Sequence, residues 1–399
     1  MKYTYSGVNI AVFSFFAVVL AFLLILSPAA AEKPTVLYVD GVNIMSSGNA
    51  GAVAGVSYDK ETGTLTLDNA TVTKGYAFSG YSVGICTDGD LKVILKGNNT
   101  IDMSNDTNGA LGVTMGNLSI EGDGSLKGTS FLGFDSEKNL NVKDCSLSVN
   151  TTSFSYYSTD NMTFSNCSVT GKATGHWCVV VLGGDFRADN STVTVSGIDG
   201  IICNHGNMTF SESNVAASGS EDGLGAYGYV TVESGNISAT GGEAAIFAGE
   251  TNTNYPDDYD PGRSMLNPFE IINQTKPETS PSPGIILSDK VDLKSPENAS
   301  IVCGDWTYEE RLYGYVAITS ISTGEISFDE DGILQGAAKT VLIVPYVEPT
   351  PEPESPVSES PSSEGSEGSG SKSIPFPGFA LILAGAAAAC FAGSLRKKE

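Results

Sequence analysis

A short polar turn followed by alternating apolar and polar residues recurs between residues 65 and 230, and this repeat constrains the fold more than any other feature. Consecutive copies begin 22 to 27 residues apart, each at an apolar anchor residue. The eight anchors are Leu65, Leu91, Leu118, Leu140, Met162, Phe186, Met208 and Val230. A period this short, with strand-like contents such as NMTFSNCSVTGK, indicates one coil of a solenoid per repeat rather than one domain per repeat.

Each repeat also contains a second alternating pair after its turn, such as Leu147 and Val149 or Val193 and Val195. Side chains along a strand point to opposite faces in turn, so the apolar positions would fill an interior and the Thr, Ser, Asn and Lys positions would face solvent. No stretch of ten residues here shows helical spacing, which argues against a leucine-rich-repeat horseshoe. The sequence predicts an all-β parallel β-helix of about eight or more coils, right-handed as parallel crossovers generally are.

The amino-terminal segment, residues 1–31, has the composition of an export signal. It contains Lys2, an apolar run over residues 10–26, and three alanines at positions 29–31. This order is typical of a secretory signal peptide cleaved before Glu32. An uncleaved membrane helix is the alternative, because the run is long for a signal peptide. Either interpretation predicts an exported chain.

The carboxyl-terminal region divides into a stalk and a hydrophobic tail. Residues 347–373 are mostly Pro, Glu, Ser and Gly, a composition that cannot bury a core and predicts an extended stalk. Residues 374–399 contain Pro377-Gly378-Phe379, then an apolar stretch, then a basic end. The apolar stretch is just long enough for a transmembrane helix, and the basic end favours the cytoplasmic side.

This tail resembles the archaeal sorting signal that archaeosortases process. The resemblance covers about 25 residues, with the short motif, the apolar helix and the basic end in the required order. It implies that an archaeosortase-type enzyme removes the tail and that a lipid is attached to the new carboxyl end. The alternative is an ordinary single-pass membrane anchor. Both alternatives predict a cell-surface protein anchored to the membrane, within or beyond an S-layer.

The charge balance of the chain bounds its partners. The formal net charge is −25, from 46 acidic and 21 basic residues, and no basic stripe offsets it, so nucleic acid is excluded as a partner. No cofactor is required. Within residues 251–284, a long acidic and Pro-rich loop, Asp257, Asp258 and Asp260 could offer carboxylates to calcium. Their spacing differs from that of an EF-hand loop, and a solvated acidic loop is the alternative.

Sequons for N-glycosylation are dense. They begin at Asn69, Asn98, Asn105, Asn117, Asn150, Asn161, Asn166, Asn190, Asn207, Asn236, Asn273 and Asn298. Turns between coils are rich in Asn, so we expect many of these sites to be exposed and the protein to be a glycoprotein. Turn chemistry alone also enriches Asn beside Ser and Thr, which is the alternative explanation.

Two cysteines occupy equivalent positions in neighbouring repeats. Cys145 and Cys167 each follow their anchor by five residues and are 22 residues apart. Adjacent coils lie about 4.8 Å apart, a spacing within the Cα range that a disulfide accepts. We therefore predict a disulfide between them. The chain has no Cys-X-X-Cys pair, which argues against a cysteine metal site.

The region around the coils carries a second resemblance. Residues 35–42 and 55–66 precede the first coil, and a Ser-Pro-Glu-Asn segment precedes a closing strand at residues 340–344. With the repeats, these passages resemble surface proteins that have a pectate-lyase-like β-helix and are identified as carbohydrate-binding. The resemblance covers most of residues 35–346. It implies the fold and a role in carbohydrate binding or adhesion.

The residues that could carry chemistry are few. Arg187 is flanked by Asp185 and Asp189, and His205-Gly206 matches half of a hydrolase turn. Carboxylates do not recur at this position on the neighbouring coils, and a base without a calcium-binding cluster is poorly suited to lyase chemistry, so we identify no catalytic residue. Aromatic residues that could stack on sugar rings precede the anchors, and packing inside the coil is their alternative role. The candidate binding residues are Tyr156, Tyr157, Trp177, Tyr227 and Tyr229.

The sequence thus predicts an archaeal, membrane-anchored surface glycoprotein whose β-helix acts as an adhesin-like or carbohydrate-binding module. A polysaccharide or surface glycan is the expected ligand. The alternatives are a β-helix polysaccharide lyase or hydrolase, and a structural spacer in the envelope. The expected segments are a signal peptide (1–31), a parallel β-helix (32–250), the acidic loop (251–284), a closing β segment (285–346), the stalk (347–373) and the sorting signal with its transmembrane helix (374–399).

Overall fold

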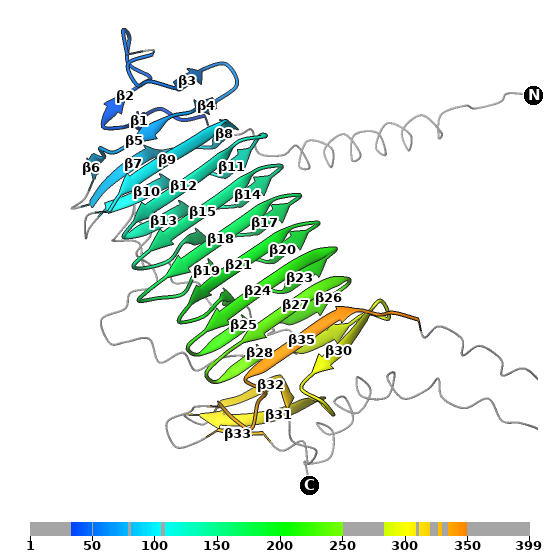
Figure 1. Cartoon of the computed structure of the whole chain (residues 1–399). Helices are drawn as coiled ribbons and strands as arrows, with labels where there is room; N and C mark the ends of the chain where they lie inside the picture. Colours follow the sequence, from blue (N-terminus) through cyan, green and yellow to red (C-terminus); the bar gives the residue numbers. More distant parts are fainter. Residues whose placement is uncertain are drawn as a thin grey trace, which may run out of the picture. The chain divides into compact units, whose positions relative to one another are not determined.

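The computed structural model describes residues 33–49, 51–78, 81–104, 108–249, 283–308, 311–319, 326–328 and 334–348. In these ranges all regular structure is β, and the predicted parallel β-helix is confirmed (Figure 1). None of the described segments forms a helix long and apolar enough to cross a membrane. The predicted signal peptide, the body of the acidic loop, most of the stalk and the sorting signal lie outside the described residues.

Three long sheets and one short ribbon contain the strands. Sheet A contains β1 (Leu37–Val39), β2 (Val42–Asn43), β6 (Tyr76–Phe78), β7 (Tyr81–Thr87), β10 (Asn108–Val113), β13 (Leu132–Ser136), β16 (Tyr156–Ser158), β19 (Val179–Val181), β22 (Ile201–Cys203), β25 (Asp222–Ala226), β28 (Ala244–Gly249), β31 (Ser300–Tyr308) and β32 (Arg311–Thr319). Sheet B contains β3 (Val56–Asp59), β4 (Thr64–Asp68), β8 (Leu91–Lys96), β11 (Leu118–Glu121), β14 (Leu140–Lys143), β17 (Met162–Ser165), β20 (Phe186–Asp189), β23 (Met208–Ser211), β26 (Tyr229–Val232) and β29 (Gly284–Leu287). Sheet C contains β5 (Thr71–Val72), β9 (Asn98–Met103), β12 (Ser125–Ser130), β15 (Ser146–Thr151), β18 (Ser168–Ala173), β21 (Thr192–Gly197), β24 (Ser213–Gly219), β27 (Gly235–Thr240), β30 (Val291–Ser295) and β35 (Thr340–Pro345). The ribbon pairs β33 (Ser327–Phe328) with β34 (Leu334–Gln335).

Each regular coil contributes one strand to sheet B, one to sheet C and one to sheet A, in that order. Full coils of this kind run from β8, β9 and β10 to β26, β27 and β28, which makes about seven turns. A first coil with a two-residue strand in sheet C (β4, β5 and β7) precedes them. The hand of the coil stays a prediction.

The anchor residues stack in register through sheet B. Leu118 pairs with Leu91 on one side and with Leu140 on the other, and this register continues to Val230. The first predicted anchor departs from it, because Leu65 pairs with Val93. β4, the strand that contains Leu65, also forms an antiparallel hairpin with β3. The first coil therefore differs from the later coils, whose sheet B strands pair only in parallel.

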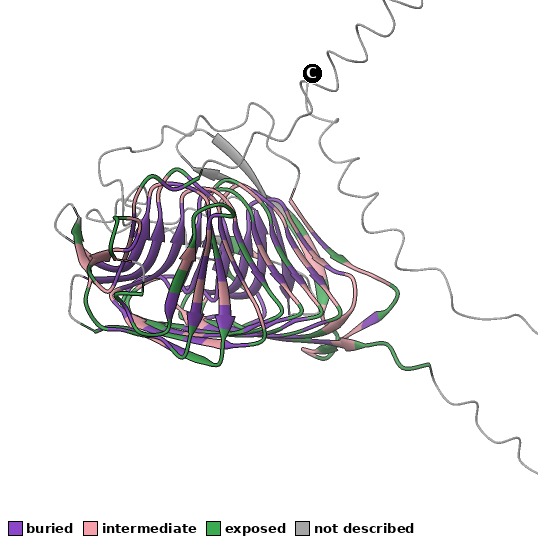
Figure 2. Ribbon diagram, turned by 90° about the horizontal axis from the view of Figure 1, so that it is seen from above, coloured by how far each residue is buried: buried purple, intermediate pink, exposed green. Residues whose placement is uncertain are grey.

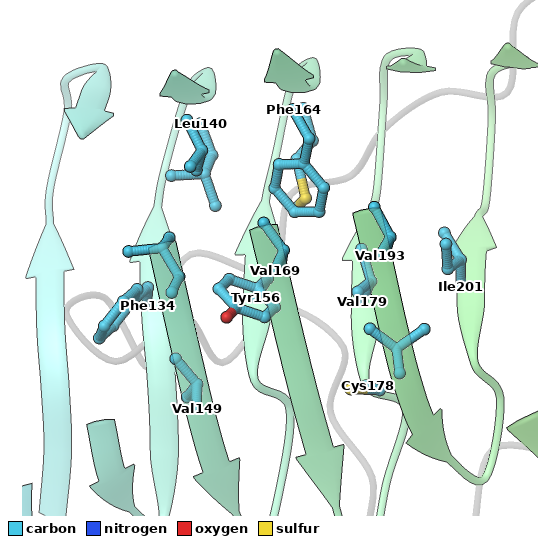
Figure 3. Packing of buried hydrophobic residues seen from close by; sticks show 14 of the residues in the cluster. Phe134, Leu140, Val149, Tyr156, Phe164, Val169, Cys178, Val179, Val193 and Ile201 are labelled. Carbon is cyan, nitrogen blue, oxygen red and sulfur yellow. The ribbon is translucent and has the colours of Figure 1, made fainter. Parts of the chain in front are cut away.

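The interior of the coil is filled by the apolar positions of the repeat. In β14 the residues alternate between buried and exposed, as the period-two pattern predicts. Aromatic rings stack along the interior in edge-to-face contacts: the ring centroids of Tyr156 and Phe164 are 5.7 Å apart, and those of Phe164 and Phe186 are 5.4 Å apart. Tyr156 and Phe164 both lie among the buried apolar residues inside the coil (Figure 3). Buried residues run through the strands, and exposed residues lie both at the turns and at alternate positions within many strands (Figure 2).

A ladder of carboxylate and amide side chains, here called the Asx ladder, holds the turns between sheets A and B. Its members are Asp90, Asn117, Asn139, Asn161, Asp185 and Asn207. Each side-chain oxygen accepts the backbone N–H of the equivalent residue one coil further on, as in the 2.8 Å bond from Asn207 N to Asp185 Oδ1. The ladder satisfies backbone groups that the turns would otherwise leave unpaired.

Antiparallel strands close the ends of the stack. At the amino-terminal end β1 pairs antiparallel with β7, and β3 pairs antiparallel with β4. At the other end β32 pairs antiparallel with β28, and β35 pairs antiparallel with β27. The predicted closing strand at residues 340–344 corresponds to β35. Unpaired edge strands can associate with other chains. The antiparallel strands pair with the outermost strands of the stack and so cover these edges.

Candidate functional site

A shallow groove of about 290 Å³ follows the corner where sheet B passes into sheet C. It crosses four consecutive coils, at the turns that lead into β12, β15, β18 and β21. Its lining residues are Asp123, Gly124, Asp144, Cys145, Ser146, Asn166, Cys167, Ser168, Asn190 and Thr192. Because the coils repeat about every 4.8 Å, equivalent side chains follow one another along the groove at that interval.

One side of the groove is a row of amide and carboxylate groups. Asn166 Nδ2 donates to Asp144 Oδ1 at 2.6 Å, and Asn190 Nδ2 donates to Asn166 Oδ1 at 3.1 Å. All three residues have positive φ, between 44° and 54°. Asp and Asn adopt this left-handed conformation more readily than most residues, which explains their recurrence at the turn. Lys143 Nζ lies 3.8 Å from Asp144 Oδ2.

The other side of the groove is a row of hydroxyl groups. Ser146, Ser168 and Thr192 begin three successive strands of sheet C and pair in register. All three are exposed, because they occupy the outward positions of the alternating pattern. The groove therefore presents hydrogen-bonding groups from both sides to solvent.

The floor of the groove contains the two stacked cysteines, and the predicted disulfide between Cys145 and Cys167 is wrong. Both thiols are free and buried. Parallel neighbours stack with their Cβ atoms pointing the same way, about 4.8 Å apart, whereas a disulfide needs them about 3.8 Å apart. Each thiol has its own contact: Cys145 Sγ lies 3.8 Å from the Ile120 carbonyl oxygen, and Cys167 Sγ lies 3.5 Å from Ser191 Oγ. Burial raises the pKa of the Cys145 thiol to about 12, so it stays neutral.

The candidate aromatic residues of β16 lie on opposite faces of sheet A. Tyr156 is fully buried inside the coil, and its hydroxyl donates to the Thr170 carbonyl at 2.8 Å (Figure 3). Tyr157 points outward, yet it is only 2 % exposed and belongs to a second apolar cluster with Phe154 and Trp177. Sheet A is thus buried on both faces here. These rings offer no open face on which a sugar could stack.

The other two candidate aromatic residues lie near the Asx ladder. Tyr227 is buried, and its ring makes an edge contact with His205 at a centroid distance of 5.7 Å. Tyr229 is half-buried, and its backbone N–H donates to Asn207 Oδ1 at 2.8 Å. Their positions assign both residues a packing or turn role.

Arg187 lies on the outer face of sheet B and is held by two acidic residues. Its Nε is 2.7 Å from Asp189 Oδ2, and a terminal nitrogen is 3.6 Å from Glu233 Oε2. The hydrogen bond to Asp189 raises the pKa of the guanidinium further. The third candidate, Asp185, is a member of the Asx ladder and accepts two hydrogen bonds from Asn207. The arginine is therefore an ion-pair partner and does not face the groove.

Sequence reasoning missed a pair of buried aspartates at the turn from sheet C into sheet A. Asp199 Oδ1 accepts the backbone N–H of Asp222 at 2.8 Å, and Asp222 Oδ1 accepts that of Ala244 at 3.1 Å. Burial raises the pKa of Asp199 to about 7 and that of Asp222 well above its usual range, and Glu221 and Glu243 add repulsion. The signal was an Asp-Gly pair at residues 199–200 that recurs 23 residues later.

The predicted calcium ligands Asp257, Asp258 and Asp260 lie outside the described residues, as do the sequons at Asn105 and Asn273. Within the described ranges, no group of three or more His, Cys, Asp or Glu residues is arranged to hold a metal ion. The groove itself was also missed. Its signal was an Asp or Asn five or four residues after successive anchors, and we interpreted these positions only as turns or sequons.

No family model matches this chain, and neither a curated protein nor a solved structure matches it. The β-helix is thus established by the strand register, and the function is inferred from the chemistry of the groove.

Proposed function

We propose that this chain is an exported, membrane-anchored surface glycoprotein whose β-helix binds an extended glycan along the groove. One observation carries the binding proposal: exposed amide and carboxylate groups from four consecutive coils, and exposed hydroxyl groups from three of them, line one groove. Sugars are recognised through hydrogen bonds to their hydroxyl groups, and such groups donate and accept them. The repeated spacing suits a ligand that is itself a repeating polymer.

The charges of the groove favour a neutral or amino-sugar glycan over an acidic one. Asp123 and Asp144 line the groove, and the whole chain has a formal net charge of −25. Like charges repel an acidic polysaccharide at this surface, whereas an ammonium group would be attracted. The export signal and the anchor, which the ends of the sequence suggest, would place the groove outside the cell.

Binding without cleavage is the activity we propose. Arg187, the arginine that a lyase would need, is paired with Asp189 and Glu233 on sheet B, away from the residues that line the groove. Asp144 accepts a hydrogen bond from Asn166, which suits a group that orients a ligand.

A retention assay with the full chain tests the proposal. Purified protein would be immobilised and exposed to neutral, amino-sugar and acidic polysaccharides, and retained polymer and newly formed chain ends would both be measured. We expect retention of a neutral or amino-sugar polymer without new ends. New reducing or unsaturated ends would establish an enzyme instead, and no retention of any polymer would support a structural spacer.

Variants of the groove make the assay specific. Asp123→Ala and Asp144→Gly remove its two carboxylates, and glycine accepts the positive φ at position 144. We expect the double variant to weaken retention about tenfold, a loss of ~1.4 kcal/mol. Asp102→Ala is the control, because it removes an exposed carboxylate of sheet C that lies outside the groove. Equal loss in the control would contradict binding in the groove.

A further inference from the structure

Ten of the twelve sequons begin at described residues. They fall into two groups, according to whether the side-chain amide nitrogen donates a hydrogen bond within the fold. N-glycosylation joins the Asn Nδ2 atom to a sugar, so that nitrogen must be accessible. In seven of the ten, Nδ2 donates a hydrogen bond within the fold: Asn69, Asn117, Asn161, Asn166, Asn190, Asn207 and Asn236. In the other three, Asn98, Asn150 and Asn298, it donates none.

The Asx ladder fixes the orientation of three sequon amides. Asn117 Oδ1 accepts the backbone N–H of Asn139, and Asn161 Oδ1 accepts that of Asp185 at 2.9 Å. A backbone donor must face an oxygen, so the amide nitrogen must point to the preceding coil, where Asn161 Nδ2 donates to Asn139 Oδ1 at 2.9 Å. The amide cannot turn outward without breaking both bonds.

The backbone of the next coil also crowds these amides. A methyl group placed on Gly184 would lie 2.6 Å from Asn161 Oδ1, and one on Gly228 would lie 2.4 Å from Asn207 Oδ1. At Asn69, a methyl group on Gly97 would lie 2.7 Å from Nδ2 itself. A site that has no room for a methyl group on the adjacent backbone is closely packed on that side, and a sugar is far larger.

The three remaining sequons are open. Asn98 is the first residue of β9, and Asn150 is the last but one of β15. Both occupy outward positions of sheet C and are exposed. Asn98 uses only its oxygen, which accepts a hydrogen bond from Ser125 Oγ at 2.9 Å. Asn298 is exposed in the turn between β30 and β31. Each amide nitrogen can therefore accept a substituent without loss of an internal hydrogen bond.

We propose that N-linked glycans are attached at Asn98, Asn150 and Asn298, and that the Asx-ladder sequons at Asn117, Asn161 and Asn207 carry none. In the reaction Nδ2 loses one proton and forms a bond to the anomeric carbon of a sugar phosphate ester donor, whose phosphate leaves. The inference rests on the proposed function for export to the surface. It adds which sequons are modified and gives the three Asx-ladder sequons a structural role.

Glycopeptide mass spectrometry of the full chain, purified from its native cells, tests the inference. We expect glycan on the peptides with Asn98, Asn150 and Asn298, and unmodified peptides with Asn117, Asn161 and Asn207. Glycan at any of the three ladder sites, or its absence from the three open sites, would overturn the inference. An unglycosylated chain that still retains polysaccharide would leave the proposed binding function intact, and a correctly glycosylated chain that retains none would contradict only that function.

Variants separate modification from a structural role. Asn98→Gln should remove one glycan mass and leave the melting temperature unchanged, and Thr100→Ala should do the same by removing the sequon without changing the asparagine. Asn161→Gln should remove no mass and lower the melting temperature by several degrees. Loss of a glycan mass in Asn161→Gln would contradict the assignment. So would an unchanged glycan mass in both Asn98→Gln and Thr100→Ala.

Discussion

Asn139 donates its side-chain amide to Asn117 Oδ1 across 2.7 Å, and its own oxygen accepts the backbone N–H of Asn161 at 3.1 Å. One side chain therefore links three coils. Asn139 is not part of a sequon, so its replacement removes no glycosylation site.

We expect Asn139→Ala to lower the free energy of unfolding by ~1–3 kcal/mol, because it leaves the backbone N–H and the side-chain amide of Asn161 without their shared acceptor. Chemical denaturation would measure the change. Asn141→Ala is the matched control, since this exposed asparagine lies two residues away on the outward face of β14. A similar loss in both variants would mean that the ladder bonds do not stabilise the stack.

Cys145 and Cys167 should remain unreactive thiols in the folded protein. Both are buried, and burial raises the pKa of each thiol, to about 12 for Cys145, so little thiolate forms near neutral pH. We expect iodoacetamide to modify neither cysteine until the chain is unfolded, and both afterwards, as read by peptide mass spectrometry without reductant. A disulfide-linked peptide pair, or rapid labelling of the native protein, would refute this.

The stability of the fold should fall as pH rises from about 4 to 7. The folded-state pKa of Asp199 is raised from its ordinary 3.8 to about 7, so its contribution is fully present below pH 4 and is lost as the buried carboxyl ionises. Asp199→Asn keeps the oxygen that accepts from Asp222. We expect this variant to match the parent at pH 4 and to be more stable by ~1–4 kcal/mol at pH 8. Thermal unfolding at both pH values measures this.

The exposed Asp289→Asn is the control for that experiment. If it stabilises the protein at pH 8 as much as Asp199→Asn does, the effect comes from net charge and the buried aspartate is not its source.

Tyr156→Phe should lower the free energy of unfolding by ~1 kcal/mol, because the Thr170 carbonyl loses a partly buried hydrogen bond while the aromatic packing remains. Polysaccharide retention by the folded variant should be unchanged, since the ring lies inside the coil. The same retention column and a melting curve would measure both properties. A selective loss of retention at unchanged stability would restore Tyr156 to the binding surface.

The repeat was sufficient to predict the coil, because burial in a solenoid follows directly from period-two alternation. The Leu65 register was not predictable in the same way, since the spacing of one coil does not reveal that its strand also pairs with the hairpin partner β3. The cysteines show a similar limit. Their equal distance from the anchor residues correctly placed Cys145 and Cys167 on adjacent coils. Their Cβ atoms point the same way, however, and stay too far apart for a disulfide.

The site was less predictable because it depends on which outward positions are covered. Tyr157 alternates with an interior residue, as an outward residue should, yet its face of sheet A is buried. The sequence pattern reports which face of a strand a side chain occupies. It does not report whether a second layer covers that face, so aromatic residues were predicted at the surface and the groove of Asp, Asn and Ser residues was overlooked.

The antiparallel strands that close the stack make its inner coils interchangeable. Residues 140–161 form one complete unit of 22 residues, and their removal would place the Leu118 strand beside the Met162 strand with the same register and with both caps unaltered. Duplication of such a unit would insert one coil by the same rule. Genetic gain or loss of whole repeats can therefore lengthen or shorten the groove one coil at a time, while the strands that close both ends stay the same.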